Sequence, residues 1–248
     1  PERLTVSPSP HIKRTDTTRS IMLDVIIALM PALLWGVYVF GPRALVVVLI
    51  SVASSVLFEY LVRLILHRPC TVGDLSAVVT GLLLGLNLPS AVSYWIPVVG
   101  AFFAIVVVKQ LFGGIGRNFA NPALTARVFL FITFSTAFVA SQTIGLGIQA
   151  STGATWLSGA KQTDKAVLYN LFIGNVGSAA VGETCVIAIL LGYVYLSVRR
   201  VIDFRVPLMT IGWAAVFALL FDGLVKSGLS GGKLFENMLA HVLSGGLI

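Results

Sequence analysis

A run of small residues, STGAT at 151–155, precedes Trp156 in a chain that is otherwise mostly apolar. Small neighbours leave the hydroxyl of Thr155 accessible to a bulky partner. The indole of Trp156 offers a flat, amphipathic surface that suits a membrane interface or stacking on a ring. A flexible connector rich in Ser, Thr and Gly has the same composition, and composition alone favours that simpler interpretation.

A second polar stretch, KQLFGGIGRNFANPALTARVF at 109–129, combines glycines that allow close backbone approach with amide side chains: Gly113, Gly114, Gly116, Asn118 and Asn121. Asn121 followed by Pro122 predicts the start of a helix, with Asn121 as its N-cap. A helix start accounts for Pro122 and Asn121 but leaves the glycines unexplained. The stretch is therefore either a loop between helices or a broken segment that binds a ligand through Asn118 and Asn121.

Six carboxylates lie within or beside apolar segments: Asp24, Glu59, Asp74, Glu183, Asp203 and Asp222. Ionisable residues inside a membrane are functional candidates by default. Asp74 and Glu183 are the preferred ion-coupling candidates, because each ends a Val-Gly-acid tripeptide at an interrupted segment. Either could instead be a charge at a helix start, where the helix dipole favours an acid.

Several kinds of site are not predicted. The cysteines and histidines lack the spacing of metal ligands, so no metal site is expected: Cys70, Cys185, His11, His67 and His241. The net charge of +7 comes from basic residues scattered at the ends of apolar segments, without a dense basic and aromatic stripe. Nucleic-acid binding is therefore not expected, and no residue is assigned a catalytic role.

The elements that must position these residues are apolar helices. The chain has 248 residues, of which 57% are hydrophobic and only 11% are charged, against about 25% charged in soluble domains. Six segments read as membrane helices by length and composition: 21–39, 44–66, 94–112, 123–140, 183–198 and 206–225. The sequence predicts an all-α polytopic membrane protein.

Positive charge sets the expected orientation. With the N-terminus inside, 12 of the 17 Lys and Arg residues lie on the cytoplasmic side and 5 outside. Residues 1–20 are then a cytoplasmic N-terminal tail, and the loop 141–165 is extracytoplasmic. In this scheme Arg63, Lys109 and Arg127 are topological charges.

Two segments are irregular and indicate an internal repeat. Residues 72–89 are short for a membrane helix, and residues 166–198 are long and interrupted by glycines. Interrupted segments at corresponding places in two halves point to broken helices around a central site. We expect a first transmembrane repeat at 21–140 and a second at 166–248, the latter incomplete because its final apolar segment is short.

Three stretches together resemble the RnfD/NqrB family, its RnfD branch most closely: 7–36, 113–129 and 151–157. The resemblance covers most of the chain. It implies FMN joined to Thr155 by a phosphoester, installed by a separate FMN transferase. Trp156, Asn118 and Asn121 are the further cofactor-binding candidates, and a second, non-covalent flavin is a further expectation. One departure is Gln149, where the family pattern usually has an acid. Thr152 occupies the earlier Ser/Thr position of the pattern and is a decoy candidate for the acceptor.

The same resemblance implies a fold of two inverted repeats with broken helices, like that of urea transporters. It implies a subunit of an ion-translocating (Na⁺ or H⁺) electron transport complex that relays electrons and is not catalytically complete alone. Its partners would be the other membrane and peripheral subunits, and its place the bacterial or archaeal cytoplasmic (inner) membrane, spanned several times. The alternatives are a solute transporter or channel without a redox cofactor, and a purely structural scaffold subunit.

Overall fold

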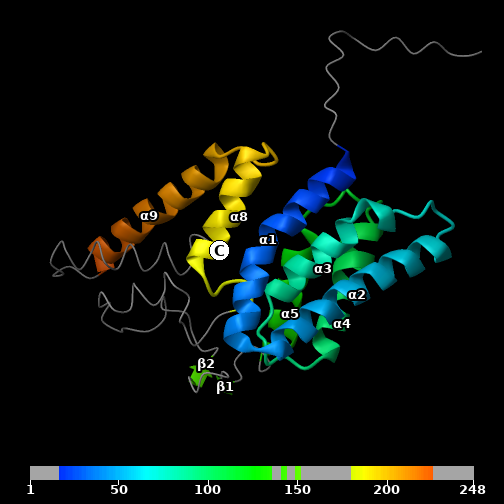
Figure 1. The fold of residues 1–248 in the computed structure, drawn as a ribbon, viewed down its shortest axis with the longest axis horizontal. Coiled ribbons are helices and arrows are strands. Elements are labelled where there is room, and N and C mark those ends of the chain that lie inside the picture. The colour runs from blue at the N-terminus through cyan, green and yellow to red at the C-terminus, as the bar shows by residue number, and fades with distance from the viewer. Residues whose placement is uncertain (1–16, 136–140, 144–148, 152–179, 226–248) are drawn as a thin grey trace, which may run out of the picture.

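A computed structural model of the chain describes residues 17–135, 141–143, 149–151 and 180–225 (Figure 1). The described residues form a bundle of helices and one short hairpin. In chain order the elements are α1 (Thr18–Phe40), α2 (Pro42–Ile65), the 3₁₀ turn η1 (Val72–Asp74), α3 (Ser76–Leu86), α4 (Trp95–Phe102), the π-helix η2 (Phe103–Gln110), α5 (Pro122–Thr133), β1 (Ser141–Thr143), β2 (Gln149–Ser151), α8 (Val186–Val198) and α9 (Arg205–Val225).

Helices α1 and α2 are long and apolar enough to cross a membrane, with 23 and 24 residues. At 1.5 Å per residue each extends about 35 Å, slightly more than the hydrocarbon core of a bilayer. Thr17 caps α1 by accepting a hydrogen bond from the Ser20 amide. Gly41, at a φ of 79°, ends α1, and Pro42 begins α2 at once. These residues make the connection between the two helices tight.

Helix α3 packs closely on α2 because α3 presents two glycines to it. A Cβ atom at Gly81 would lie 2.7 Å from the Cα of Val52, and one at Gly85 would lie 2.9 Å from the Cα of Val48. This is the small-residue spacing that lets membrane helices approach each other. The close contact fixes how the polar residues at the start of α3 face α2.

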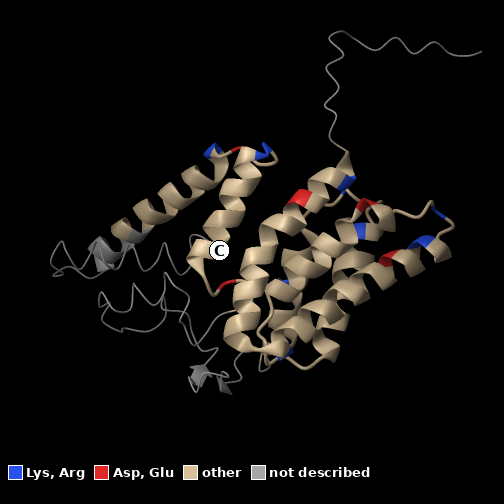
Figure 2. Cartoon of the chain, viewed as in Figure 1, with Lys and Arg blue, Asp and Glu red and all other residues tan. Residues whose placement is uncertain are grey.

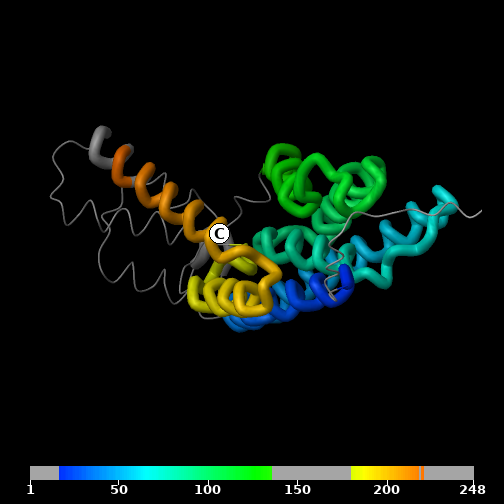
Figure 3. The backbone as a smooth tube through the Cα atoms, turned by 90° about the horizontal axis from the view of Figure 1, so that it is seen from above, coloured from blue at the N-terminus to red at the C-terminus, as the bar shows by residue number. Residues whose placement is uncertain are grey.

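Helix α3 lies inside the bundle. Figure 3 shows α1 and α8 together on one side and the green helices η2 and α5 on the other, with α3 between them. The largest apolar cluster among the described residues joins α2, α3, α4 and α5 through Val47, Leu84, Leu88, Ile96 and Leu130. A second cluster joins α1, α2 and α3 to Val181.

Helix α8 is held against α1 by polar contacts and by close backbone packing. Arg199 forms an ion pair with Asp24 at 3.2 Å, and the Tyr195 hydroxyl donates to the same carboxylate at 3.0 Å. Gly192 packs against the Ala28 carbonyl, and Gly36 packs against the Val181 carbonyl, each leaving no room for a Cβ atom. The parts of the chain before and after the loop 141–165 therefore contact each other directly.

The structure confirms that the first irregular segment is interrupted, and it describes the second only from residue 180 onward. Helix α3 has only 11 residues and is separated from η1 by Leu75, whose φ is 65°. Helix α8 begins at Val186, after a non-helical stretch at 180–185. One detail departs from the all-helical expectation, because β1 and β2 pair antiparallel at the start of the loop 141–165.

Charged residues gather mainly at the ends of the helices, as Figure 2 shows, and a few lie inside the bundle. Two of the inner ones are Lys109 and Arg63, both buried. Their burial is not accounted for by a role in topology alone, because a buried charge needs a partner. The partner of Lys109 defines the candidate site.

Candidate functional site

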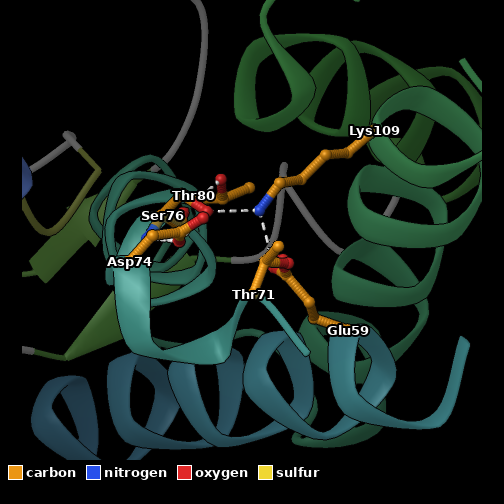
Figure 4. A network of polar contacts seen from close by, with 6 residues as sticks. All are labelled: Glu59, Thr71, Asp74, Ser76, Thr80 and Lys109. Carbon is orange, nitrogen blue, oxygen red and sulfur yellow. Dashed lines mark hydrogen bonds and ion pairs between the residues drawn. The ribbon is translucent and has the colours of Figure 1, made fainter. Parts of the chain in front are cut away.

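The candidate site is a buried ion pair between α2 and η2. The Nζ atom of Lys109 lies 2.6 Å from Oε2 of Glu59, and the two side chains are 2% and 0% exposed (Figure 4). An isolated charge in such surroundings is very unfavourable, whereas a paired and hydrogen-bonded charge is tolerated. Each residue therefore makes the burial of the other possible.

Hydroxyl groups from the α2–α3 connection and from α3 surround this pair. The Thr71 hydroxyl donates to Oε1 of Glu59 at 2.7 Å, so both carboxylate oxygens are used. Lys109 also donates to the Ser76 hydroxyl at 2.6 Å, and Ser76 in turn donates to Oδ1 of Asp74 at 2.6 Å. We call Glu59, Thr71, Asp74, Ser76 and Lys109 the buried charge network; Glu59, Ser76 and Lys109 are buried, and Thr71 and Asp74 are half-buried.

The broken start of α3 is what brings these groups together. Asp74 ends η1 and accepts the amide of Ser76, the first residue of α3, at 2.8 Å. This contact holds the Ser76 hydroxyl toward Lys109 (Figure 4). Thr80, one turn later on α3, donates to the Ser76 carbonyl. Asp74, which the sequence predicts at an interrupted segment, therefore lies beside the ion pair. Its local contact with Ser76 also fits a charge at a helix start.

Lys109 lies near the end of a rare kind of helix. Residues 103–110 follow the i→i+5 hydrogen-bond pattern of a π-helix, and the Leu111 amide continues that pattern to the Val106 carbonyl at 3.1 Å. Such segments occur mostly as short bulges and are frequent at functional sites. Here the wide turn directs Lys109 toward Glu59.

A polar stripe on α2 continues from the network. Ser51, Ser55, Glu59 and Arg63 recur every four residues, all are buried, and together they form one face of the helix. The Ser51 hydroxyl donates to the Gly81 carbonyl on α3 at 2.8 Å. The stripe therefore runs along the α2–α3 contact rather than toward lipid.

The second ion-coupling candidate, Glu183, lies elsewhere. The turn that carries it packs on the end of α3, where the Gly182 amide donates to the Leu86 carbonyl at 2.8 Å. Asp74 precedes the other end of α3, so about 16 Å of helix separates the two candidates. The structure does not bring Asp74 and Glu183 together.

Glu183 forms a separate polar cluster with Arg127 and Asn87. Arg127 lies 2.8 Å from Oε1 of Glu183 and donates to the Asn87 amide oxygen at 2.8 Å. Arg127, taken from the sequence as a topological charge, is therefore a link between α5, α3 and the turn before α8. Asn87 and Glu183 line an otherwise mostly apolar cavity of about 360 Å³.

The two asparagines of the glycine-rich stretch make local contacts. The Asn121 side chain accepts the Ala123 amide at 3.0 Å, which confirms it as the N-cap of α5. The amide nitrogen of Asn118 faces the carbonyls of Lys109 and Gly114 and donates to them at 3.2 and 2.9 Å. Asn118 thus supports the chain immediately after η2. Thr155 and Trp156 lie outside the described residues.

Comparison with known proteins agrees with the three motifs found in the sequence. The family described as NQR2, RnfD, RnfE matches residues 5–248. The chain belongs to the NQR2, RnfD, RnfE family. This family assignment confirms the resemblance drawn from the N-terminal stretch, the glycine-rich stretch and the STGAT run.

Relatives from three organisms are similar over nearly the whole chain. The D component of the Na⁺-translocating ferredoxin:NAD⁺ oxidoreductase complex of Acetobacterium woodii is 41% identical, over 99% of this chain and 74% of that protein. The D component of the proton-translocating ferredoxin:NAD⁺ oxidoreductase complex of Clostridium ljungdahlii is 32% identical, over 98% and 75%. The D component of the ion-translocating oxidoreductase complex of Stutzerimonas stutzeri is 36% identical, over 92% and 72%.

In this member of the NQR2, RnfD, RnfE family, the sequence favours Asp74 over Glu59 as an ion-coupling residue and does not single out Lys109. The signal that could have identified Glu59 is the four-residue repeat of polar side chains from Ser51 to Arg63 on an apolar helix. Nothing comparable marks Lys109, because its partner is 50 residues away in the sequence. In the structure, the network holds the Lys109 ammonium against Glu59.

Proposed function

We propose that this chain is the membrane subunit of an ion-translocating electron transport complex, that it carries covalently bound FMN, and that it relays electrons within that complex. The names of the relatives support the complex and the ion translocation. The structural observation that carries the proposal is the buried charge network, because paired charges among apolar helices mark ion pathways in membrane proteins.

The proposed site of flavin attachment is the Thr155 hydroxyl, through a phosphoester that an FMN transferase installs. When bound, FMN supplies electron-transfer chemistry, and the protein positions and tunes it. The small residues of STGAT leave the acceptor accessible, and Trp156 provides a surface for the ring. Asn118 and Asn121 are proposed contacts of a second, non-covalent flavin, in addition to their local hydrogen bonds.

The proposed ion-coupling residues are Asp74 and Glu183, each now seen with a charged neighbourhood. Asp74 reaches the Glu59–Lys109 pair through the Ser76 hydroxyl. Glu183 is paired with Arg127. Because the relatives include one named for Na⁺ and one named for protons, either ion fits the proposal.

The proposed architecture is two inverted repeats, at 21–140 and 166–248, joined by an extracytoplasmic flavin-attachment loop at 141–165. The support is that both Val-Gly-acid tripeptides occupy turns directly before a helix, α3 and α8. The chain would cross the inner membrane several times with residues 1–20 in the cytoplasm. Other membrane and peripheral subunits of the complex would be its partners.

Flavin fluorescence in a denaturing gel tests the proposal. We expect the chain, produced with an FMN transferase, to fluoresce under ultraviolet light and to gain the mass of one FMN. Thr155→Val should remove both signals, while the matched variant Thr152→Val should keep them. A dark wild-type band of unmodified mass, from a host whose transferase modifies a known substrate, contradicts the flavin assignment.

A further inference from the structure

Arg63, in the last turn of α2, is a buried cation without an acidic partner. It is 9% exposed, and its Nε atom is enclosed without a hydrogen-bond partner in the described part of the chain. The ion pairs of the described residues do not include Arg63. Both oxygens of Glu59, one turn earlier, are taken by Lys109 and Thr71. Because a buried charge is tolerated when it is paired or hydrogen-bonded, Arg63 lacks the group that would neutralise it.

The guanidinium group of Arg63 lies against the glycine turn 113–116, which follows η2. Its Nη2 atom is 2.9 Å from the position that a Cβ atom would take at Gly114. The side chain of Arg117 packs on Gly113 in the same way, with Cδ 3.1 Å from the corresponding position. Gly113 and Gly114 have φ values of 105° and 99°, which favour glycine. Two arginine side chains therefore contact one turn that side-chain-bearing residues would not readily form.

The glycine turn also presents backbone donors. The amides of Ile115 and Gly116 make no hydrogen bond to the backbone within the described ranges, and nothing described there lies within 4 Å of a Cβ position at Gly116. Consecutive amides in such a turn form a concavity that binds anions. The planar fork of an arginine matches two oxygens of a phosphate. This set of donors suits a phosphate group, which would supply the negative charge that Arg63 lacks.

Exposed apolar side chains surround this turn and the end of α2. Phe112 and Phe119 pack edge to face, with 5.0 Å between ring centroids, yet both stay exposed. Other exposed apolar residues of the two segments are Leu64, Ile65, Leu111 and Ile115. Basic groups next to exposed apolar groups, at the end of a helix long enough to cross a membrane, suit a phospholipid: the former meet the headgroup and the latter the acyl chains.

We propose that Arg63, Arg117 and the glycine turn 113–116 bind the phosphate of an anionic phospholipid, whose acyl chains lie along the exposed apolar residues at the end of α2. The phosphate is the counter-charge of the buried guanidinium group. The inference goes beyond the proposed function. It depends neither on flavin attachment nor on the ion-coupling role of Asp74 and Glu183.

Native mass spectrometry of the purified full-length chain in detergent tests the site. One dioleoylphosphatidylglycerol should bind per chain, whereas dioleoylglycerol, which has the same acyl chains and no phosphate, should not. Arg63→Gln should weaken binding of the phospholipid by about tenfold or more, because charge-assisted hydrogen bonds are lost. The matched control Arg68→Gln removes an exposed positive charge beyond the same end of α2 and should weaken it by less than about twofold.

Two outcomes of this titration overturn the proposal. Equal losses in Arg63→Gln and Arg68→Gln would show general attraction to a basic surface instead of a site. Displacement of the phospholipid by excess inorganic phosphate would show that the acyl chains contribute nothing and that the site binds free phosphate.

A measurement on the wild-type chain covers the case in which Arg63→Gln does not fold. Phenylglyoxal modification of Arg63, followed by peptide mass spectrometry, should be severalfold lower with added dioleoylphosphatidylglycerol than with dioleoylglycerol. Arg43, which is exposed at the opposite end of α2, should be modified equally in both samples. Equal modification of Arg63 in the two samples would mean that no phospholipid covers it, and the proposal would fail.

Discussion

Glu59 and Lys109 form the most consequential contact among the described residues. Both lie on mostly apolar helices, and both are removed from solvent. A buried ion pair contributes little net stability compared with apolar residues of the same shape, but breaking it leaves a buried charge without compensation. Its presence here is therefore better explained by function than by stability.

The first prediction is a double-mutant cycle on this pair. We expect Glu59→Gln to lower the free energy of unfolding by about 3–5 kcal/mol, because Lys109 remains buried without its counter-charge. Lys109→Met should cost a similar amount, because it leaves Glu59 buried without its counter-charge. The double variant should cost clearly less than the sum of the two, as judged by chemical or thermal unfolding in detergent.

The control for this cycle is Arg68→Gln, at an exposed position beyond the end of α2, which should change stability by less than about 0.5 kcal/mol. Additive effects of the two single substitutions would contradict a direct Glu59–Lys109 interaction.

The second prediction separates two roles of Asn121. As the N-cap of α5, its replacement in Asn121→Ala should cost about 1 kcal/mol of stability. Asn121→Asp keeps an oxygen that can accept the Ala123 amide and should restore most of that stability. Non-covalent flavin in the purified chain is measured alongside. Loss of flavin in a stable Asn121→Asp variant would show a cofactor contact beyond the cap, whereas retained flavin would assign Asn121 to the helix start alone.

At the scale of elements, the contact between α2 and α3 depends on glycine. Gly81→Ala places a methyl group against the α2 backbone, so we expect a loss of about 1–3 kcal/mol. Gly212 on α9 is the matched control, since nothing among the described residues lies within 4 Å of its Cβ position. Gly212→Ala should instead stabilise the chain by about 0.5–1 kcal/mol, through better helix propensity. Equal effects in thermal unfolding would show that the α2–α3 approach does not depend on Gly81.

The helix breaks could be predicted from the sequence because their causes are local. Glycine and an acid before a short apolar run indicate an interruption, and Asn121-Pro122 is a helix-start signal. The π-helical register of η2 could not be predicted in this way, because residues 103–110 read as an ordinary apolar helix followed by a lysine. The register is associated with Lys109 contacts to Glu59 and Ser76, which belong to other helices.

At the scale of the whole molecule, the charge pattern alone could not separate topological charges from buried ones. Lys109 and Arg127 follow the positive-inside pattern, yet each pairs with an acid at least 50 residues away in the chain. The arrangement of the helices decides which basic residues meet an acid, and that arrangement is a tertiary property. Conversely, the prediction for the flavin loop depends on residues 151–157, which act as a local motif.

The last prediction tests the orientation of the chain with its own cysteine. Cys70 is exposed in the connection between α2 and η1, at the end of α2 that carries Arg63 and Arg68, whereas Cys185 is buried. If basic ends are cytoplasmic, a membrane-impermeant maleimide applied to right-side-out vesicles should not label Cys70 until the membrane is permeabilised. Thr152→Cys, introduced into a Cys70→Ser background, should be labelled without permeabilisation, because the loop 141–165 is expected outside.

Labelling of Cys70 in intact vesicles would place the STGAT run on the cytoplasmic side. An acceptor threonine on that side is incompatible with extracytoplasmic flavin attachment, so this one measurement constrains both the orientation and the proposed function.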